Sequence, residues 1–201
     1  TMASRRRLGT AHQRPHFLII NLKKKKNMAV SIDDIKKLRA MTGAGLADVK
    51  KALTEAEGDF DKAKELLRER GLAIAAKRSD RETSNGCVLV KQEGDFAAMV
   101  AIKCETDFVA NGADFIALVK EILDAAVAAK VKTLDEVKAL KLANGEDAAT
   151  AVQQRSGVTG EKMELDGYNY MEGANVSVYD HMNKHTLATM VQLSDSNEDA
   201  G

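Results

Sequence analysis

Few residues in this chain could carry out covalent chemistry. It has two cysteines and four histidines among 201 residues. A nucleophile and base could be formed by Cys104 with His181 or His185. No oxyanion-hole motif and no third orienting residue accompanies that pair. The histidines are too few and too scattered for a metal site. The sequence therefore predicts that the chain is not an enzyme and holds no cofactor or metal.

Phosphate-binding and redox roles also find little support. Gly43 and Gly45 fit neither a P-loop nor a dinucleotide-binding fingerprint, because no Gly-Lys-Ser/Thr follows them. Cys87 and Cys104 both lie in apolar, strand-like runs. Two cysteines in a chain of this length do not form a disulfide framework. We predict that both are reduced core residues.

A different kind of candidate is the neighbouring pair Asp107 and Phe108, which follows a predicted strand. An acidic and an aromatic side chain at that position can project together from the edge of a domain and contact a partner. The alternative is that Phe108 folds back onto the core, as isolated aromatic residues usually do.

Charge is distributed unevenly along the chain. Overall, 30 Lys and Arg balance 30 Asp and Glu, but eight of the basic residues fall in residues 1–27, where no acidic residue occurs. Residues 28–201 therefore carry a net charge of about −8, which phosphate backbones would repel. No apolar run approaches the ~20 residues of a membrane-spanning helix. We predict no direct nucleic-acid partner and no membrane partner.

The elements that would position these residues begin with three short helices in residues 31–71. Ser31 and Asp34 form a variant of the capping box, and Asp59 can cap the third helix. Glycine-containing turns separate the helices, and Gly71 is predicted to end the third. Three such helices are typical of a ubiquitin-associated-like module, which is marginally stable alone.

The hydrophobic period then changes from that of helices to that of strands. Residues 87–90 and 96–104 are predicted to form a hairpin across a turn at 93–95. Both of its faces are largely apolar, so we expect helices on one side and allow for a second contact on the other. The strongest helix, 113–129, should cover the hairpin. Shorter helices are predicted at 134–142 and 148–154, and strands at 175–179 and 186–193. The predicted fold class is α+β.

Two separated segments resemble signatures of the elongation factor Ts family. The first runs from Leu38 to Leu53 and contains Thr-Gly-Ala-Gly, then Leu-Ala-Asp-Val, then Lys-Lys-Ala-Leu. Ala47 stands where the family often has methionine, and Val49 where it often has cysteine. The second runs from Cys104 to Asn111 and contains Cys-Glu-Thr-Asp-Phe-Val-Ala. Their order and spacing identify a member of this family, and the resemblance covers roughly residues 29–193.

The resemblance implies a guanine-nucleotide exchange factor of translation elongation, which promotes GDP release from elongation factor Tu by protein contact. Phe108 would wedge between two helices of the partner near its Mg²⁺ site, and Asp107 would form hydrogen bonds beside it. Loss of metal and phosphate-loop contacts would then weaken GDP binding. An alternative is a non-catalytic adaptor that binds a partner through the helical module only.

Further contacts follow from the same resemblance. Thr159 to Met163 resembles the family's Ile-Gly-Glu-Asn segment, and Tyr179-Asp180-His181 resembles a tyrosine, apolar residue, histidine motif. The implied partner-binding residues are Asp107, Phe108, Thr106, Val109, Leu46, Ala47, Lys50, Thr159, Gly160 and His181.

These segments define the predicted domains. They are a disordered extension (1–27), the three-helix module (28–71), a linker (72–85), one core subdomain (86–165) and part of a second (166–201). The extension could be a transit peptide, a nucleic-acid-binding arm or the product of an early start codon; we favour the last, with the true start at Met28. The chain is expected to be truncated, with an exposed strand edge. We predict a cytoplasmic protein, or an organellar one if a transit peptide is present. A homodimer through the core is left open.

Overall fold

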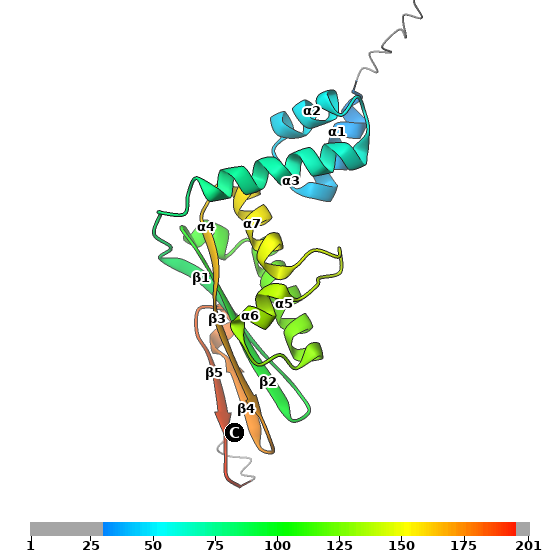
Figure 1. Cartoon of the computed structure of the whole chain (residues 1–201). Helices are drawn as coiled ribbons and strands as arrows, with labels where there is room; N and C mark the ends of the chain where they lie inside the picture. The colour runs from blue at the N-terminus through cyan, green and yellow to red at the C-terminus, as the bar shows by residue number, and fades with distance from the viewer. Residues whose placement is uncertain (1–29, 196–201) are drawn as a thin grey trace, which may run out of the picture.

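The computed structural model describes residues 30–195, and the predicted extension at 1–27 lies outside them. The architecture is α+β, as predicted (Figure 1). A cluster of three helices occupies one end of an elongated molecule. Antiparallel strands with helices packed on them form the rest.

The N-terminal cluster consists of α1 (Ile32–Thr42), α2 (Leu46–Glu55) and α3 (Phe60–Ala76). Helix α1 begins with the predicted capping box, in which Ser31 and Asp34 bond to one another's backbone N–H groups. The inner faces of the three helices share one small core. Its buried members are Ile35, Leu38, Ala44, Val49, Ala52, Leu53, Ala56 and Ala63.

The predicted end of the third helix at Gly71 is wrong. Helix α3 continues through Gly71 to Ala76, so the connection to the first strand is shorter than the predicted linker. A glycine inside a helix usually costs about 1 kcal/mol relative to alanine. Here Gly71 is buried against Gly157 of another helix, and tertiary packing therefore keeps the helix intact.

The main sheet has the order β1-β2-β3 with antiparallel neighbours, as Figure 1 shows. Its strands are β1 (Asn85–Glu93), β2 (Phe96–Cys104) and β3 (Met163–Glu172). The predicted hairpin is confirmed: Gly94, with φ of +62°, lies in the turn that pairs Glu93 with Phe96. Strand β2 is the centre of the sheet and the most completely buried strand.

Strand β3 was not expected from the sequence. It pairs with β2 from Met163 to Glu172, with a register shift where Gly167 faces Ala101. A Cβ at Gly167 would stand 2.6 Å from the Ala101 Cβ, so glycine permits this close pairing. The strand also passes through residues 165 and 166, between which the two core subdomains were predicted to divide.

Helices cover one face of this sheet. They are α5 (Ala113–Ala129), α6 (Leu134–Ala139) and α7 (Ala148–Thr159), and α5 has the bounds that the sequence predicted. Helix α6 ends earlier and α7 later than expected. The main core lies between this layer and the sheet and includes Phe96, Phe115, Val119 and Ile122.

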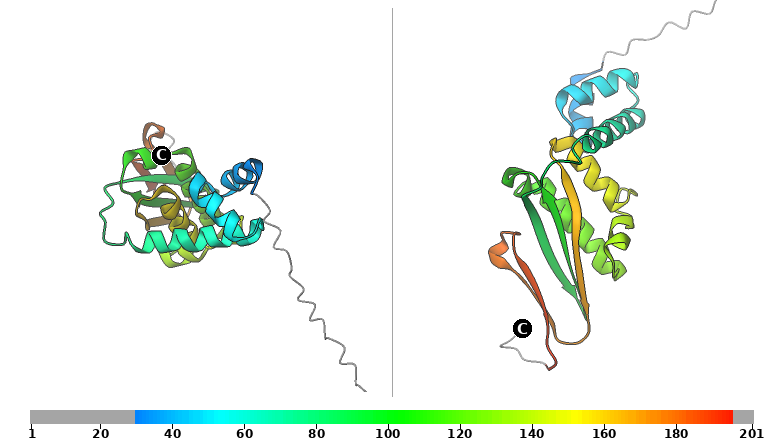
Figure 2. Two further views of the ribbon diagram at one scale, coloured as in Figure 1. Left: turned by 90° about the horizontal axis from the view of Figure 1, so that it is seen from above. Right: turned by 60° about the vertical axis from the view of Figure 1, so that its left-hand side comes forward.

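A second hairpin lies on the opposite face of the sheet from the helices (Figure 2). It consists of β4 (Val176–Asp180), the short 3₁₀ turn η1 (His181–Asn183) and β5 (Ala188–Gln192). The Val88 backbone N–H of β1 donates to the His185 carbonyl at 2.7 Å and anchors this hairpin. The sequence allowed for a second contact on the other face of the first hairpin, and the β4–β5 hairpin supplies this contact.

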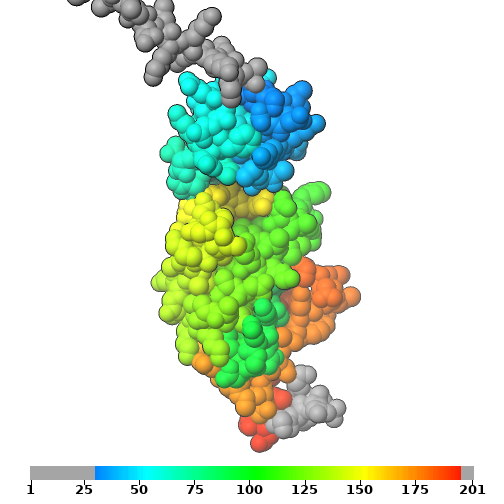
Figure 3. Space-filling model, turned by 90° about the vertical axis from the view of Figure 1, so that its right-hand side faces the viewer, coloured from blue at the N-terminus to red at the C-terminus, as the bar shows by residue number. Residues whose placement is uncertain are grey.

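Seen from the side, the three-helix cluster stacks directly on α7 (Figure 3). Helix α3 makes this contact and continues past the edge of its own cluster. Within residues 30–195, no helix combines the length and the hydrophobicity that crossing a bilayer would require.

Candidate partner-binding site

The most exposed large apolar side chain of the described residues is Phe108, which is 86% exposed. It lies in α4 (Asp107–Ala110), a single helical turn that directly follows β2. Phe96 and Phe115, by contrast, are almost completely buried. Leaving such a ring in water forgoes about 1.5–3 kcal/mol of burial free energy. The exposed ring is therefore a candidate contact for another molecule.

Asp107 is exposed beside Phe108, as the first residue of α4. Its backbone carbonyl accepts hydrogen bonds from the backbone N–H and side-chain amide of Asn111, at 2.9 and 2.8 Å. Within residues 30–195, no donor is bonded to the Asp107 carboxylate. The carboxylate and the aromatic ring can therefore approach a partner together.

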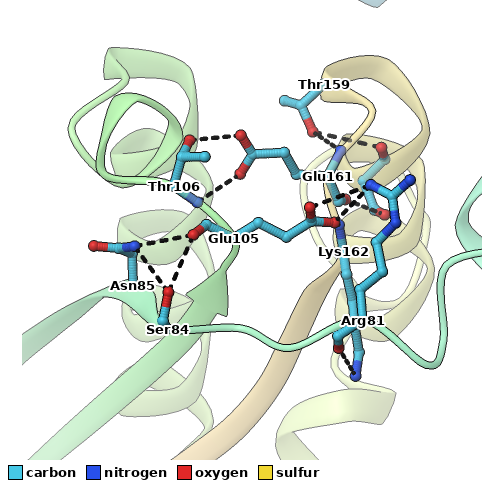
Figure 4. A network of polar contacts seen from close by, with 9 residues as sticks. Arg81, Ser84, Asn85, Glu105, Thr106, Thr159, Glu161 and Lys162 are labelled. Atoms are coloured by element: carbon cyan, nitrogen blue, oxygen red, sulfur yellow. Dashed lines mark hydrogen bonds and ion pairs between the residues drawn. The ribbon is translucent and has the colours of Figure 1, made fainter.

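The turn that carries this pair is fixed by the segment after α7. The Glu161 carboxylate accepts hydrogen bonds from the Thr106 backbone N–H at 3.0 Å and from the Thr106 hydroxyl at 2.5 Å. In return, the Glu105 carboxylate accepts a 2.6 Å bond from the Lys162 backbone N–H. Figure 4 shows these reciprocal contacts, which we call the Glu105–Glu161 clasp. They join two segments that lie more than 50 residues apart in the chain.

Further polar groups surround the clasp. The Arg81 guanidinium lies 3.2 Å from a Glu105 oxygen, and the Lys162 ammonium donates to the Arg81 carbonyl at 2.9 Å (Figure 4). Ser84 and Asn85 side chains donate to the Glu105 carbonyl. The hydrogen bond from the Lys162 backbone, followed by those from Arg81, holds the pKa of Glu105 below its usual value. The charged form of Glu105 is therefore favoured.

A hollow of about 400 Å³ lies beside the Phe108 ring. Val109 and Thr159 line it together with Phe108, so the structure brings these three predicted residues to one place. Thr106 is the N-cap of α4, the turn that carries Phe108 and Val109. Gly160 follows Thr159 and ends α7 with φ of +80°, a conformation that favours glycine.

Leu46, Ala47 and Lys50 form a separate surface on α2. All three are exposed, and Leu46 is 57% exposed although it is apolar. Val49, between them in sequence, is completely buried. One face of α2 thus holds the helical cluster together, and the other presents the predicted contact residues.

His181 lies in η1, at the turn of the second hairpin. Its Nδ1 atom is 3.2 Å from the Tyr179 hydroxyl, and the two rings meet edge to face. The turn contains no glycine, and Met182 and Asn183 themselves adopt positive φ. His181 does not line the Phe108 hollow.

The cysteine chemistry considered from the sequence gains no support from the structure. Cys104 is completely buried, and its Sγ lies 3.2 Å from the Thr106 carbonyl. Burial raises the pKa of the Cys104 thiol to about 11 and that of the Cys87 thiol to about 12. Neither thiol is therefore prepared for nucleophilic attack.

Sequence reasoning missed the positioning residues of this site. The sequence assigns no role to Glu105, which lies in the Cys104–Asn111 segment, to Glu161, which lies in the Thr159–Met163 segment, or to Arg81, which falls in the predicted linker. A signal was present, since each acidic residue sits next to a predicted contact residue. What the sequence could not show is that the two segments meet.

Comparisons with known proteins agree with this picture. Residues 105–201 match the family model described as Elongation factor TS. Elongation factor Ts of Bacteroides thetaiotaomicron is 59% identical over 86% of this chain, and that of Bacteroides fragilis is 62% identical over 83%. The protein of the same name from Porphyromonas gingivalis is 50% identical over 85%.

The chain spans about half the length of the relatives it matches, with 52%, 50% and 62% of those three proteins covered. These identities confirm the resemblance drawn from the two signature segments. Over the part that the matches cover, the chain is therefore similar to proteins of the elongation factor Ts family.

Proposed function

We propose that this chain is a guanine-nucleotide exchange factor that promotes GDP release from elongation factor Tu during translation elongation. Its action is a protein–protein contact in which no covalent bond forms or breaks. Phe108 enters the nucleotide-binding domain of the partner, with Asp107 beside it. The partner's Mg²⁺ and phosphate contacts are disturbed, and GDP leaves.

The observation that supports this proposal best is the 86% exposure of Phe108 on a turn fixed by the Glu105–Glu161 clasp. A rigid, exposed aromatic side chain is typical of residues that dominate interface energetics. A flexible ring would lose more conformational entropy on binding and would disturb the partner less. Fixing the turn in advance reduces that loss.

Exchange of this kind is a coupling between two ligands of one partner. The chain and GDP each weaken the binding of the other by the same factor, commonly 5- to 150-fold, or about 1–3 kcal/mol. Proton transfer has no part in the process. The exposed carboxylate of Asp107 and the exposed ring of Phe108 can therefore act through contact alone, without a catalytic base.

The remaining predicted residues would contribute docking contacts. Leu46 and Ala47 offer an apolar patch, and Lys50 a charge that acts mainly on the association rate. Thr159 lines the Phe108 hollow, and Gly160 follows it at the end of α7. His181 would make a third contact from the second hairpin.

The test is release of a fluorescent GDP analogue from elongation factor Tu, measured by stopped flow. The full chain should accelerate release, and Phe108→Ala should lose most of that acceleration, about 10- to 100-fold. Ile32→Ala is the matched control, since Ile32 is also an apolar side chain in water, 72% exposed. If the Phe108→Ala and Ile32→Ala variants both accelerate GDP release from elongation factor Tu as much as the original chain does, the proposal is wrong.

A second candidate is an adaptor that binds through the helical module alone, and the exposed Leu46 favours it. The two functions separate when binding and release are measured on the same variants of the whole chain. If the chain is an adaptor, Leu46→Asp should abolish binding of the partner, and Phe108→Ala should leave that binding unchanged. An exchange factor should lose GDP release with Phe108→Ala even where binding persists.

Two further expectations, on cellular location and on oligomeric state, accompany the proposal. The activity would take place where elongation factor Tu works, in the cytoplasm or an organellar matrix. A homodimer through the core would double the docking surfaces, and analytical ultracentrifugation across a concentration series tests it.

A further inference from the structure

The contact between the helical module and the core passes through two glycines. Gly71 lies within α3 and Gly157 within α7, and the backbones of the two helices meet there. A Cβ built on Gly157 would stand 2.3 Å from Gly71 Cα and 2.6 Å from Gly71 O. Both atoms are backbone, so no side-chain rotation could relieve the clash. Only glycine at 157 allows this approach.

The two positions are not equivalent. A Cβ built on Gly71 would meet its nearest neighbours, Gln154 O and Gly157 Cα, at 3.8 Å, which is ordinary van der Waals contact. Alanine should therefore fit at 71 and not at 157. This asymmetry provides a matched pair of substitutions at the same crossing, one harmless and one disruptive.

The connection between α1 and α2 also lies against α7. At Gly43 a Cβ would lie 3.6 Å from the Arg155 guanidinium and 3.7 Å from Val158 Cγ1. Arg155 in turn forms a 3.3 Å ion pair with Asp114 of α5. The module therefore rests on α7 at two places, and α7 is tied to the rest of the core.

Helix α7 also leads into the clasp. It ends at Thr159, and Glu161 follows two residues later. The same helix therefore carries the contact with the module near its C-terminus and then positions the turn of Phe108. Figure 1 shows α3 above α7, with α4 beside the point where they cross.

We propose that the Gly71–Gly157 crossing is a positioning device that sets the spacing between the α2 surface (Leu46, Ala47, Lys50) and Phe108. Both surfaces then engage one partner molecule at once. This inference rests on the proposed function and adds a requirement to it: the module and the wedge act as one rigid unit. Two rigidly linked contacts bind far more tightly than two independent ones, because the second contact forms intramolecularly.

The first test measures the spacing without any partner. Spin labels at Lys36→Cys on α1 and Lys120→Cys on α5 are both on exposed positions, whereas Cys87 and Cys104 are buried and stay unlabelled. Double electron–electron resonance on the whole chain should give the same distance distribution with and without Gly71→Ala. Gly157→Ala should shift or broaden it, since the methyl group must move from 2.3 Å to at least about 3.4 Å. An unchanged distribution in Gly157→Ala overturns the proposal.

The second test asks whether the spacing matters to the partner. Binding of elongation factor Tu is measured for Lys50→Ala, Phe108→Ala and the double variant, in the original chain and in Gly157→Ala. The coupling between the two substitutions should be present in the original chain and in Gly71→Ala. It should be lost in Gly157→Ala, with affinity about tenfold weaker or more. Retained coupling in Gly157→Ala contradicts the inference.

Two further observations keep the outcomes separate. Circular dichroism and thermal unfolding show whether Gly157→Ala is folded; if it is not, Gly71→Val replaces it, because a Cβ at 71 already meets Gln154 O and Gly157 Cα at 3.8 Å and a larger side chain must push the two helices apart. Gly71→Val should shift or broaden the label distances, and an unchanged distribution there would also overturn the proposal. If the Phe108→Ala variant accelerates GDP release from elongation factor Tu as the original chain does, the proposed function fails. The label distances still decide whether the crossing sets the spacing.

Discussion

Glu161 holds Thr106 by two hydrogen bonds, one to its backbone N–H and one to its hydroxyl. The Thr106 oxygen also accepts a 3.4 Å bond from the Val109 backbone N–H, so the same side chain caps the turn that carries Phe108. One carboxylate from the segment after α7 thus determines how an exposed ring on another segment is presented. Hydrogen bonds to charged groups are among the stronger polar interactions in proteins.

Replacing Glu161 should therefore affect both stability and presentation of the ring. We expect Glu161→Ala to lower the free energy of unfolding by about 1–2 kcal/mol, because it removes charge-assisted bonds to Thr106. Glu161→Gln should lose less, since its amide oxygen still accepts a hydrogen bond. Urea unfolding measures the first effect, and GDP release from elongation factor Tu the second. Equal unfolding curves for Glu161→Ala and the original chain would show that the clasp is not formed in solution.

Two phenylalanines of the chain should respond oppositely to truncation. Phe115 is 2% exposed in the main core, and Phe115→Ala should lower the free energy of unfolding by about 3–5 kcal/mol. Phe108→Ala should change it by no more than about 0.5 kcal/mol, because an exposed side chain leaves no cavity. Chemical denaturation of the two variants gives the comparison. A large loss of stability in Phe108→Ala would mean that the ring packs on its own core.

The clasp also predicts a pH dependence. The folded state lowers the pKa of Glu105 from its ordinary value of 4.5, so Glu105 stabilises the fold above that pH and ceases to do so as the pH falls through the folded-state pKa. Glu105→Gln lacks this contribution at every pH. The difference in unfolding free energy between the original chain and Glu105→Gln should therefore be largest near neutral pH and shrink below about pH 4.5. Urea titrations at several pH values measure it, and a constant difference would contradict the assignment.

Both thiols should be unreactive in the folded chain. Burial raises the pKa of Cys87 to about 12 and that of Cys104 to about 11, so almost no thiolate exists at about pH 8 and little reagent reaches either sulfur. Ellman's reagent should modify neither cysteine in buffer and both in denaturant. The variants Cys87→Ser and Cys104→Ser identify the responsible residue if one does react. Rapid modification of Cys104 in the native chain would reopen the nucleophile hypothesis.

Much of the secondary structure could be predicted because its signals are local. Ser31 with Asp34 begins α1, Asp59 begins α3, and Gly94 turns the first hairpin, each through contacts within a few residues. The apolar period of 113–129 was also sufficient to give α5 its correct bounds. The family resemblance rested on contiguous segments in the same way.

Other features depended on partners far away in the chain. Gly71 looks like a helix end until Gly157 is placed against it. Strand β3 has a weak pattern of its own and exists because β2 offers it an edge to pair with. Burial and hydrogen bonding between distant segments outweigh local propensity in both cases.

The sequence by itself determined where α1 and α3 begin, the bounds of α5, the first hairpin, the fold class and the two signature segments, since each follows from residues close together. Only the tertiary structure decided that Phe108 stands in solvent and that Glu161 fixes the turn beneath it. A lone aromatic residue is usually buried, and no local pattern distinguishes an exposed one. The physical reason is that exposure depends on which segments fill the space around a residue, and here those segments are joined by a contact across 55 residues of chain.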